Sequence, residues 1–493
     1  MAVSTSDSNG TAVRMNFWLS FCMQVTFNTS GSIILLPWTF ATLGYVLGPV
    51  LMVLFFAITL RAQYFLNQSA LELPRGAVST LRDLGIQVGG RRLGLLATAV
   101  QALNMLLVMP TELNVCASAL QYVVNAQPGS AAHCNIICVL AMAVPAVLVT
   151  QVVRRFGGKT GRLACLSMVV ICAKCSLIVY SILQHADMYP SDAAPVAGMG
   201  AAARAAGTYG WSNVLSALSN FLWILAPVFI NTELAAVMEQ PEQVHRQLFM
   251  SACCMSFLYL IVGLVGATTW GVSVPNPINL QLPHDWAGIA VNCLLIYGAG
   301  LDYLLSQIVC TGFVQELLDP GFDKSDFSAS GCCRWLAYSM PANACALVLV
   351  CFVPELETLV GVVTATAATL GSWTIPALVG LHWGRRQELD LEKATTPCTQ
   401  QATAEGAAAD AEQRGADNGA VTHDVDAQVE PKIADEPHSR LVPVLEVRNR
   451  IELQQWFIAL SGIVAMVALV ANSAYAIATT DYSSQNFFCV VVG

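Results

Sequence analysis

A run of small and polar residues at 28–32 (Asn-Thr-Ser-Gly-Ser) interrupts an otherwise apolar segment and is followed by Pro37. Such residues are poor helix formers, so the run predicts a break that leaves backbone N–H groups free. A half-helix beginning near Ile33 would direct the positive end of its dipole at this break, which could then hold a carboxylate without a cationic side chain. The alternative is a face of small residues at which two helices pack closely.

A second break is predicted in a later apolar segment at Pro227, which lacks a backbone donor and frees a carbonyl one turn earlier. Freed carbonyls can accept hydrogen bonds from an ammonium group. A kinked helix without any ligand is the alternative. A carboxylate site and an ammonium site that face each other would together bind an amino acid.

The composition identifies the medium in which these breaks lie. The chain has 493 residues, of which 55% are hydrophobic and only 11% are charged, whereas soluble proteins have about 25% charged residues. This composition predicts an all-α polytopic membrane protein in contact with the lipid bilayer, and no basic surface indicates nucleic acid binding. Most of the 17 cysteines lie in apolar runs, where cysteine behaves as a small hydrophobe. The spacing of the cysteines predicts no metal site. The sequence predicts no cofactor.

About 20 apolar residues cross the hydrocarbon core. If the N-terminal tail 1–15 is cytosolic, Arg204 is the only basic residue in the connections on the outer side of the membrane. The tail has no apolar core and predicts no cleaved signal peptide. By the length criterion the sequence contains eleven membrane spans, at 16–40, 44–66, 93–124, 136–153, 162–184, 212–237, 246–270, 286–318, 333–353, 357–381 and 454–478.

The spans indicate an internal repeat. Residues 16–184 and 212–381 each contain five spans and are almost equal in length. Because five is odd, two such halves in tandem have opposite topology, which is the inverted-repeat arrangement of secondary transporters. Residues 382–453 form a predicted cytosolic acidic loop. Its central part, 387–439, has few apolar side chains and is predicted to be disordered, and it could bind cytosolic regulators.

Several segments resemble the amino acid/auxin permeases, which belong to the amino acid–polyamine–organocation superfamily. The resemblance begins at Ser30-Gly31-Ser32 and Pro37-Trp38, continues through 43–48, and leans toward vacuolar and sodium-coupled neutral amino acid transporters. Further similar segments follow in family order at 233–241, 258–271, 279–283 and 361–378. The resemblance implies a LeuT-like fold of five-plus-five inverted repeats with one extra helix, and amino acid transport by alternating access, coupled to protons or Na⁺.

The same resemblance suggests where the substrate binds. Asn104, on the third span, could also face the substrate, although packing inside the bundle is the alternative for it. The residues implied to hold the substrate carboxylate are Thr29, Ser30, Gly31 and Ser32, and the carbonyls implied to receive its amine lie near Ala226, Pro227, Val228 and Phe229.

Ionisable residues inside a membrane span are functional candidates. Lys174 and Asp302 lie midway along the fifth and eighth spans, which both flank the first helix in a LeuT-like arrangement. We therefore predict that they form an ion pair that couples transport to an ion, and a static structural pair is the alternative. An ammonium at this position could replace Na⁺, which favours proton coupling. Glu112 follows Pro110 and could attract a cation to an outer vestibule, or cap a helix kink.

Two other functions compete with transport. A sensor would bind an amino acid and signal through the cytosolic loop, whereas a membrane enzyme would need a catalytic set of His, Ser and Asp residues that the spacing does not provide. We therefore expect a transporter and no enzyme. The predicted location is the plasma membrane or a vacuolar or lysosomal membrane.

Overall fold

The computed structural model describes residues 15–29, 31–74, 77–78, 80–125, 135–154, 158–188, 211–224, 230–271, 274–353, 356–387 and 438–479. Throughout these ranges the regular elements are helices, and one isolated parallel bridge joins Met15 to Met238. The predicted all-α class is confirmed.

Helical segments lie at every predicted span. Seven of them are long and apolar enough to cross a membrane, and a bent pair, Phe17–Thr29 with Ser32–Leu43, would make an eighth. The count of eleven spans is therefore not confirmed. In chain order the α-helices are α1 (Phe17–Thr29), α2 (Leu36–Leu43), α3 (Leu47–Leu71), α4 (Leu81–Val123), α5 (Asn135–Thr150), α6 (Gly158–Gln184), α8 (Trp211–Trp223), α9 (Asn231–Val237), α10 (Val244–Trp270), α11 (Trp286–Leu318), α12 (Ala329–Phe352), α13 (Leu356–Val363) and α15 (His438–Thr479).

Shorter turns connect or continue these helices. The 3₁₀ turns are η1 (Ser32–Leu35), η3 (Ala186–Met188), η5 (Pro241–Gln243) and η7 (Ile278–Leu280), and the π-helical turns η8 (Thr364–Ala368) and η9 (Leu370–Thr374) follow α13.

Helix α4 is longer than the predicted span 93–124 because it contains a sharp turn. Gly90 has a φ of 75° and separates two helical arms, a backbone conformation that glycine adopts without a steric penalty. The arms pack closely, since a Cβ atom added to Gly85 would lie 2.9 Å from the Cα atom of Gly94. The span proper therefore starts beyond this turn.

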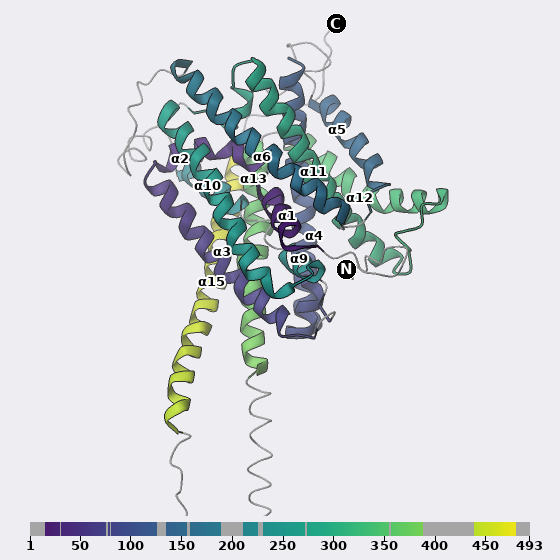
Figure 1. The fold of residues 1–493 in the computed structure, drawn as a ribbon, viewed down its shortest axis with the longest axis vertical. Coiled ribbons are helices and arrows are strands. Elements are labelled where there is room, and N and C mark those ends of the chain that lie inside the picture. The colour runs from purple at the N-terminus through teal and green to yellow at the C-terminus, as the bar shows by residue number, and fades with distance from the viewer. Residues whose placement is uncertain are drawn as a thin grey trace, which may run out of the picture.

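The helix that carries the first break lies inside the bundle. Helix α1 contacts α6, α10 and α11, and α11 also packs along α4; Figure 1 shows α1 near the middle of the view with these helices around it. The polar side chains of α1 are therefore buried, including those of Gln24, Asn28 and Thr29. Polar groups in such a place need partners within the protein, so their positions are fixed by the surrounding helices.

The predicted acidic loop 382–453 is shorter than expected. The preceding helix continues to Gln387, and α15 begins at His438. Residues 438–453 include Leu, Glu and Arg, which favour helix, so the span predicted at 454–478 extends toward its N-terminus. Figure 1 shows this helix running out beyond the bundle. Residues 388–437 lie outside the described ranges, so the prediction of disorder there stays a prediction.

Two glycines on α10 allow the short helix α2 to approach closely. A Cβ atom added to Gly263 would lie 2.5 Å from the ring of Phe40, and one added to Gly266 would lie 2.5 Å from Pro37. Phe40 is fully buried and packs edge-on against Phe221. Small residues at a helix interface permit this approach, so the two glycines fix the position of the half-helix after the break.

We expect Gly263→Ala to destabilise the protein by about 1–3 kcal/mol, because extra atoms in a packed interior force rings and backbone to shift. Thermal unfolding of the purified protein in detergent measures this effect. Gly384→Ala is the matched control, since no atom lies within 4 Å of its added Cβ. Equal melting temperatures for the two variants would contradict the proposed role of Gly263.

Candidate functional site

The first predicted break is present in the structure. Helix α1 ends at Thr29, and the chain resumes as η1 at Ser32, with a bend of 42° between the two segments. Ser30 lies outside the described residues. In the second half, α8 ends at Trp223 and α9 begins at Asn231. The residues predicted to receive the amine, Ala226, Pro227, Val228 and Phe229, all lie outside the described residues.

Side chains from three elements satisfy the carbonyl groups that the break leaves exposed. The Ser32 hydroxyl donates to the Asn28 carbonyl at 2.7 Å, and the Tyr259 hydroxyl of α10 donates to the same oxygen. The Lys174 ammonium of α6 lies 3.4 Å from the Thr29 carbonyl. A continuous helix would supply backbone N–H donors here, so these side chains replace the missing hydrogen bonds and stabilise the break.

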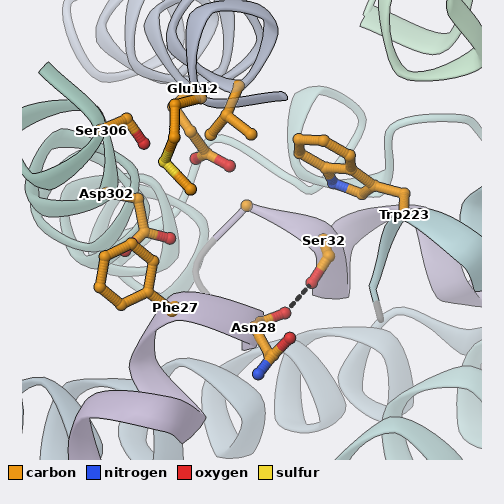
Figure 2. Close-up of a pocket in the computed structure, with 10 residues that line it drawn as sticks. Phe27, Asn28, Ser32, Glu112, Trp223, Asp302 and Ser306 are labelled. Atoms are coloured by element: carbon orange, nitrogen blue, oxygen red, sulfur yellow. Dashed lines mark hydrogen bonds between the residues drawn. The ribbon is translucent and has the colours of Figure 1, made fainter. Parts of the chain in front are cut away.

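A small cavity of about 20 Å³ lies beside the break. A cavity needs about 10–15 Å³ to hold one water molecule, so in this conformation the site holds about one water molecule and would have to widen to admit an amino acid. Figure 2 shows the side chains of Glu112 and Asp302 directed into the space next to the broken helix. The lining residues are Phe27, Asn28, Gly31, Ser32, Met105, Val108, Glu112, Trp223, Asp302 and Ser306.

Glu112 makes the closest approach to the break. A Cβ atom at Gly31 would lie 2.7 Å from its Oε2 atom and 3.1 Å from its Oε1 atom. Only glycine leaves room for the carboxylate at this position. The side chain of Glu112 is 4% exposed, and its Oε2 atom has no hydrogen-bond partner within the described part of the chain. The sequence predicted that the carboxylate of a substrate binds at this break, whereas the carboxylate found there belongs to Glu112 of the protein itself.

Three ionisable side chains interact electrostatically around the cavity. Asp302 repels the charge of Glu112, and Lys174 attracts the charges of both carboxylates. Lys174 is fully buried and lies on the α6 side of the break, whereas Asp302 and Glu112 come from α11 and α4. The predicted ion pair of Lys174 with Asp302 stays a prediction.

The remaining predicted contacts divide between the cavity and the protein interior. Gly31 and Ser32 line the cavity. The Thr29 hydroxyl donates to the Val25 carbonyl at 2.7 Å, inside helix α1, and Thr29 is not a lining residue. Asn104 is fully buried next to the lining residue Met105, but it does not line the cavity itself. None of these placements tests a role in substrate binding.

The sequence interpretation missed most of the cavity wall, although two signals were available. Met105, Val108 and Glu112 are spaced at i, i+3 and i+7, and Asp302 and Ser306 at i and i+4. Each set lies on one face of its helix. The sequence alone suggests that Glu112 lies in an outer vestibule or caps a helix kink. It does not reveal the contact with Gly31, because the two residues are far apart in the chain.

A second cavity, of about 40 Å³, shares Phe27 with the first. Its walls are mostly apolar and include Met15, Met23 and Phe313, together with Glu233. The Gln101 amide donates to the Glu233 carboxylate at 2.6 Å. The backbone of Met15 is hydrogen-bonded to Val237 and Glu239 at 2.8 and 2.9 Å. Phe27 therefore lines both the site at the break and a cavity that the N-terminal segment helps to line.

A comparison with models of protein families identifies the family of this chain. The sequence model of the transmembrane amino acid transporter proteins matches residues 16–403. The chain belongs to this family. It is therefore a membrane transporter, and the resemblance to amino acid permeases seen in the sequence is confirmed. The matched range contains every residue that lines the cavity beside the break and all three ionisable residues there.

The present chain is only distantly similar to solved structures of the Eremococcus coleocola manganese transporter. Two mutant forms and a complex with an aromatic bis-isothiourea substituted compound each show 13% identity and a TM-score of 0.47, covering 92% of this chain and 95% of that chain. At this level of similarity nothing about metal or substrate transfers to the present transporter. The comparison with curated proteins gave no match.

Proposed function

We propose that this transporter carries amino acids across a membrane by alternating access, driven by protons. In this proposal the chain has the LeuT-like arrangement of two inverted five-helix repeats, 16–184 and 212–381, with α15 as the extra span and the N-terminus in the cytosol. The substrate binds in the cavity beside the first break. Gly31 and Ser32 contribute to its carboxylate site, and the segment containing Pro227 contributes to its amine site.

The observation that carries the proposal is a broken helix whose gap lines a cavity between buried charges. Irregular backbone within a membrane protein is tolerated where it lines a cavity or is buried in protein, and transporters bind their substrates at such breaks. The family of the chain supports the same function.

The position of Lys174 favours protons over Na⁺. Its ammonium lies at the Thr29 carbonyl, where a bound Na⁺ would need backbone oxygens as ligands. A fixed positive charge there leaves less room and less attraction for a second cation. Proton movement supplies enough energy, because 100 mV contributes about 2.3 kcal/mol and one pH unit about 1.4 kcal/mol.

Uptake of labelled amino acids by proteoliposomes tests the proposal. We expect an inward proton gradient to drive accumulation, and replacement of Na⁺ by choline at fixed pH to leave it unchanged. Accumulation that needs Na⁺ would support the sodium-coupled alternative. Binding of an amino acid without any flux would favour a sensor and contradict transport.

A further inference from the structure

The charge balance of the cavity limits what can bind there. Glu112 and Asp302 line it, and Lys174 interacts with both carboxylates. With all three side chains ionised, the group carries one net negative charge. No Lys, Arg or His is among the described residues that line the cavity. A buried charge without compensation is costly, so this set of side chains favours the binding of one additional positive charge.

The carboxylate of an amino acid would make this imbalance larger. A zwitterion adds no net charge, but the proposed site places its carboxylate near Gly31 and Ser32, and the Glu112 carboxylate already lies against Gly31. Two carboxylates in contact among buried side chains cannot both stay ionised without strong repulsion. Entry of the substrate carboxylate therefore requires Glu112 to move away or to become neutral.

Glu112 has the geometry of a group that can change its charge in this way. It is almost fully buried, and its Oε2 atom is without a hydrogen-bond partner in the part of the chain that the structure describes. The titratable groups that interact with it are Asp302 on α11, Lys174 on α6 and Cys116 on α4, and Tyr259 on α10 interacts with Asp302. The Lys174 ammonium is held at the Thr29 carbonyl.

We infer that Glu112 binds the transported proton, and that the substrate carboxylate and the ionised Glu112 carboxylate exclude each other beside Gly31. This inference rests on the proposed function as an amino acid transporter. Protonation of Glu112 removes the repulsion and lets the substrate in. Loss of the proton on the other side of the membrane restores the negative charge and favours release of the substrate. One proton is then carried with each zwitterionic amino acid.

The inference predicts how substrate affinity depends on pH. If binding takes up one proton, the affinity of the wild-type protein falls by about tenfold for each rise of one pH unit above the pKa of Glu112 in the substrate-free protein. In Glu112→Gln, whose amide imitates the protonated acid, the affinity should be the same at every pH. Binding of a labelled amino acid to the purified full-length protein at a series of pH values measures this affinity.

The decisive experiment compares the wild type, Glu112→Gln and Glu233→Gln in proteoliposomes. Glu233 is the matched control, because its carboxylate also lines a cavity but lies away from the break. Amino acid exchange at equal pH on both sides measures folding and binding. Accumulation under an inward proton gradient measures coupling. We expect the gradient to give Glu112→Gln no acceleration over that variant's own exchange rate, and to accelerate Glu233→Gln as much as the wild type.

A gradient response of Glu112→Gln equal to that of the wild type would overturn the inference and leave amino acid transport intact. So would wild-type accumulation driven by Na⁺ alone. If neither Glu112→Gln nor Glu112→Met folds, calorimetry of wild-type binding in buffers of different ionisation enthalpy counts the protons, and a count of zero overturns the inference without a variant. A folded wild type that moves no amino acid under any gradient would instead contradict the proposed function.

Discussion

Replacing Gly31 with alanine should reduce amino acid uptake by about 100-fold, because displacing a positioned group by about 1 Å can have an effect of this size. The added Cβ atom would lie 2.7 Å from the Oε2 atom and 3.2 Å from the Cδ atom of Glu112. The obstructing atoms are the far end of a flexible side chain, so the carboxylate moves and the backbone stays. The carboxylate then occupies the cavity space that the substrate needs.

Uptake of labelled amino acid by proteoliposomes, with the melting temperature of each variant as a check on folding, measures this effect. Gly300→Ala on α11 is the matched control, since its added Cβ would meet only the Cys116 sulfur at 3.9 Å. In the double variant Gly31→Ala/Glu112→Asp the carboxylate is one methylene shorter, and uptake should partly recover. Wild-type uptake by Gly31→Ala would show that this contact has no part in transport.

The first break was predictable from sequence because its cause is local. Residues 28–32 include a glycine and several small polar side chains, and these disfavour helix whatever surrounds them. The hydrogen bonds that stabilise the broken state were not predictable in the same way. Tyr259 and Lys174 reach the carbonyls of Asn28 and Thr29 from α10 and α6, and only the packing of helices brings these residues together.

The role of Glu112 shows the same limit more clearly. Its helix face could be predicted from the spacing of Met105, Val108 and Glu112, but that face could point at lipid, at another helix or at the break. The glycine at position 31 permits the approach of the carboxylate. Glycine is common in membrane helices for other reasons, above all close helix packing, so the residue alone did not identify its partner.

The limits of helices were predicted less well than their positions. Apolar length identifies the part of a helix that lies in lipid, so the sequence placed α4 and α15 correctly. It did not give the arm of α4 before Gly90, or the start of α15 at His438. Both extensions contain polar and charged residues that form helix readily, and hydropathy cannot distinguish them from a loop.

Removing the charge of Lys174 should have the second large effect. In Lys174→Met the cavity retains the two carboxylates of Glu112 and Asp302 and loses the cation that attracts both. Leaving a buried charge without its partner costs about 3–5 kcal/mol of unfolding free energy. The Thr29 carbonyl also loses the ammonium group that lies 3.4 Å from it. We expect a large fall in the melting temperature of the purified protein at neutral pH.

The sign of the pH dependence provides an internal check. When the pH falls, a carboxylate of the variant takes up a proton and the repulsion decreases, so acid should raise the stability of Lys174→Met relative to the wild type. Lys174→Arg keeps the charge and is the matched control, with a smaller loss expected from its different shape. A melting temperature of Lys174→Met that equals the wild-type value at neutral pH would rule out an electrostatic role for Lys174.

The double variant Lys174→Met/Asp302→Asn separates a structural pair from a coupling pair. Removing both charges leaves Glu112 as the one ionisable side chain among these three residues. The repulsion between the two carboxylates is then absent, so the melting temperature should recover most of the loss seen in Lys174→Met. If the pair serves only to hold α6 and α11 together, uptake driven by a proton gradient recovers with the stability. If the pair takes part in coupling, stability and amino acid exchange recover while accumulation under the gradient does not. We expect the second result, because Asp302 lines the cavity and Lys174 interacts with both carboxylates, so that removing the two charges changes how readily Glu112 takes up a proton.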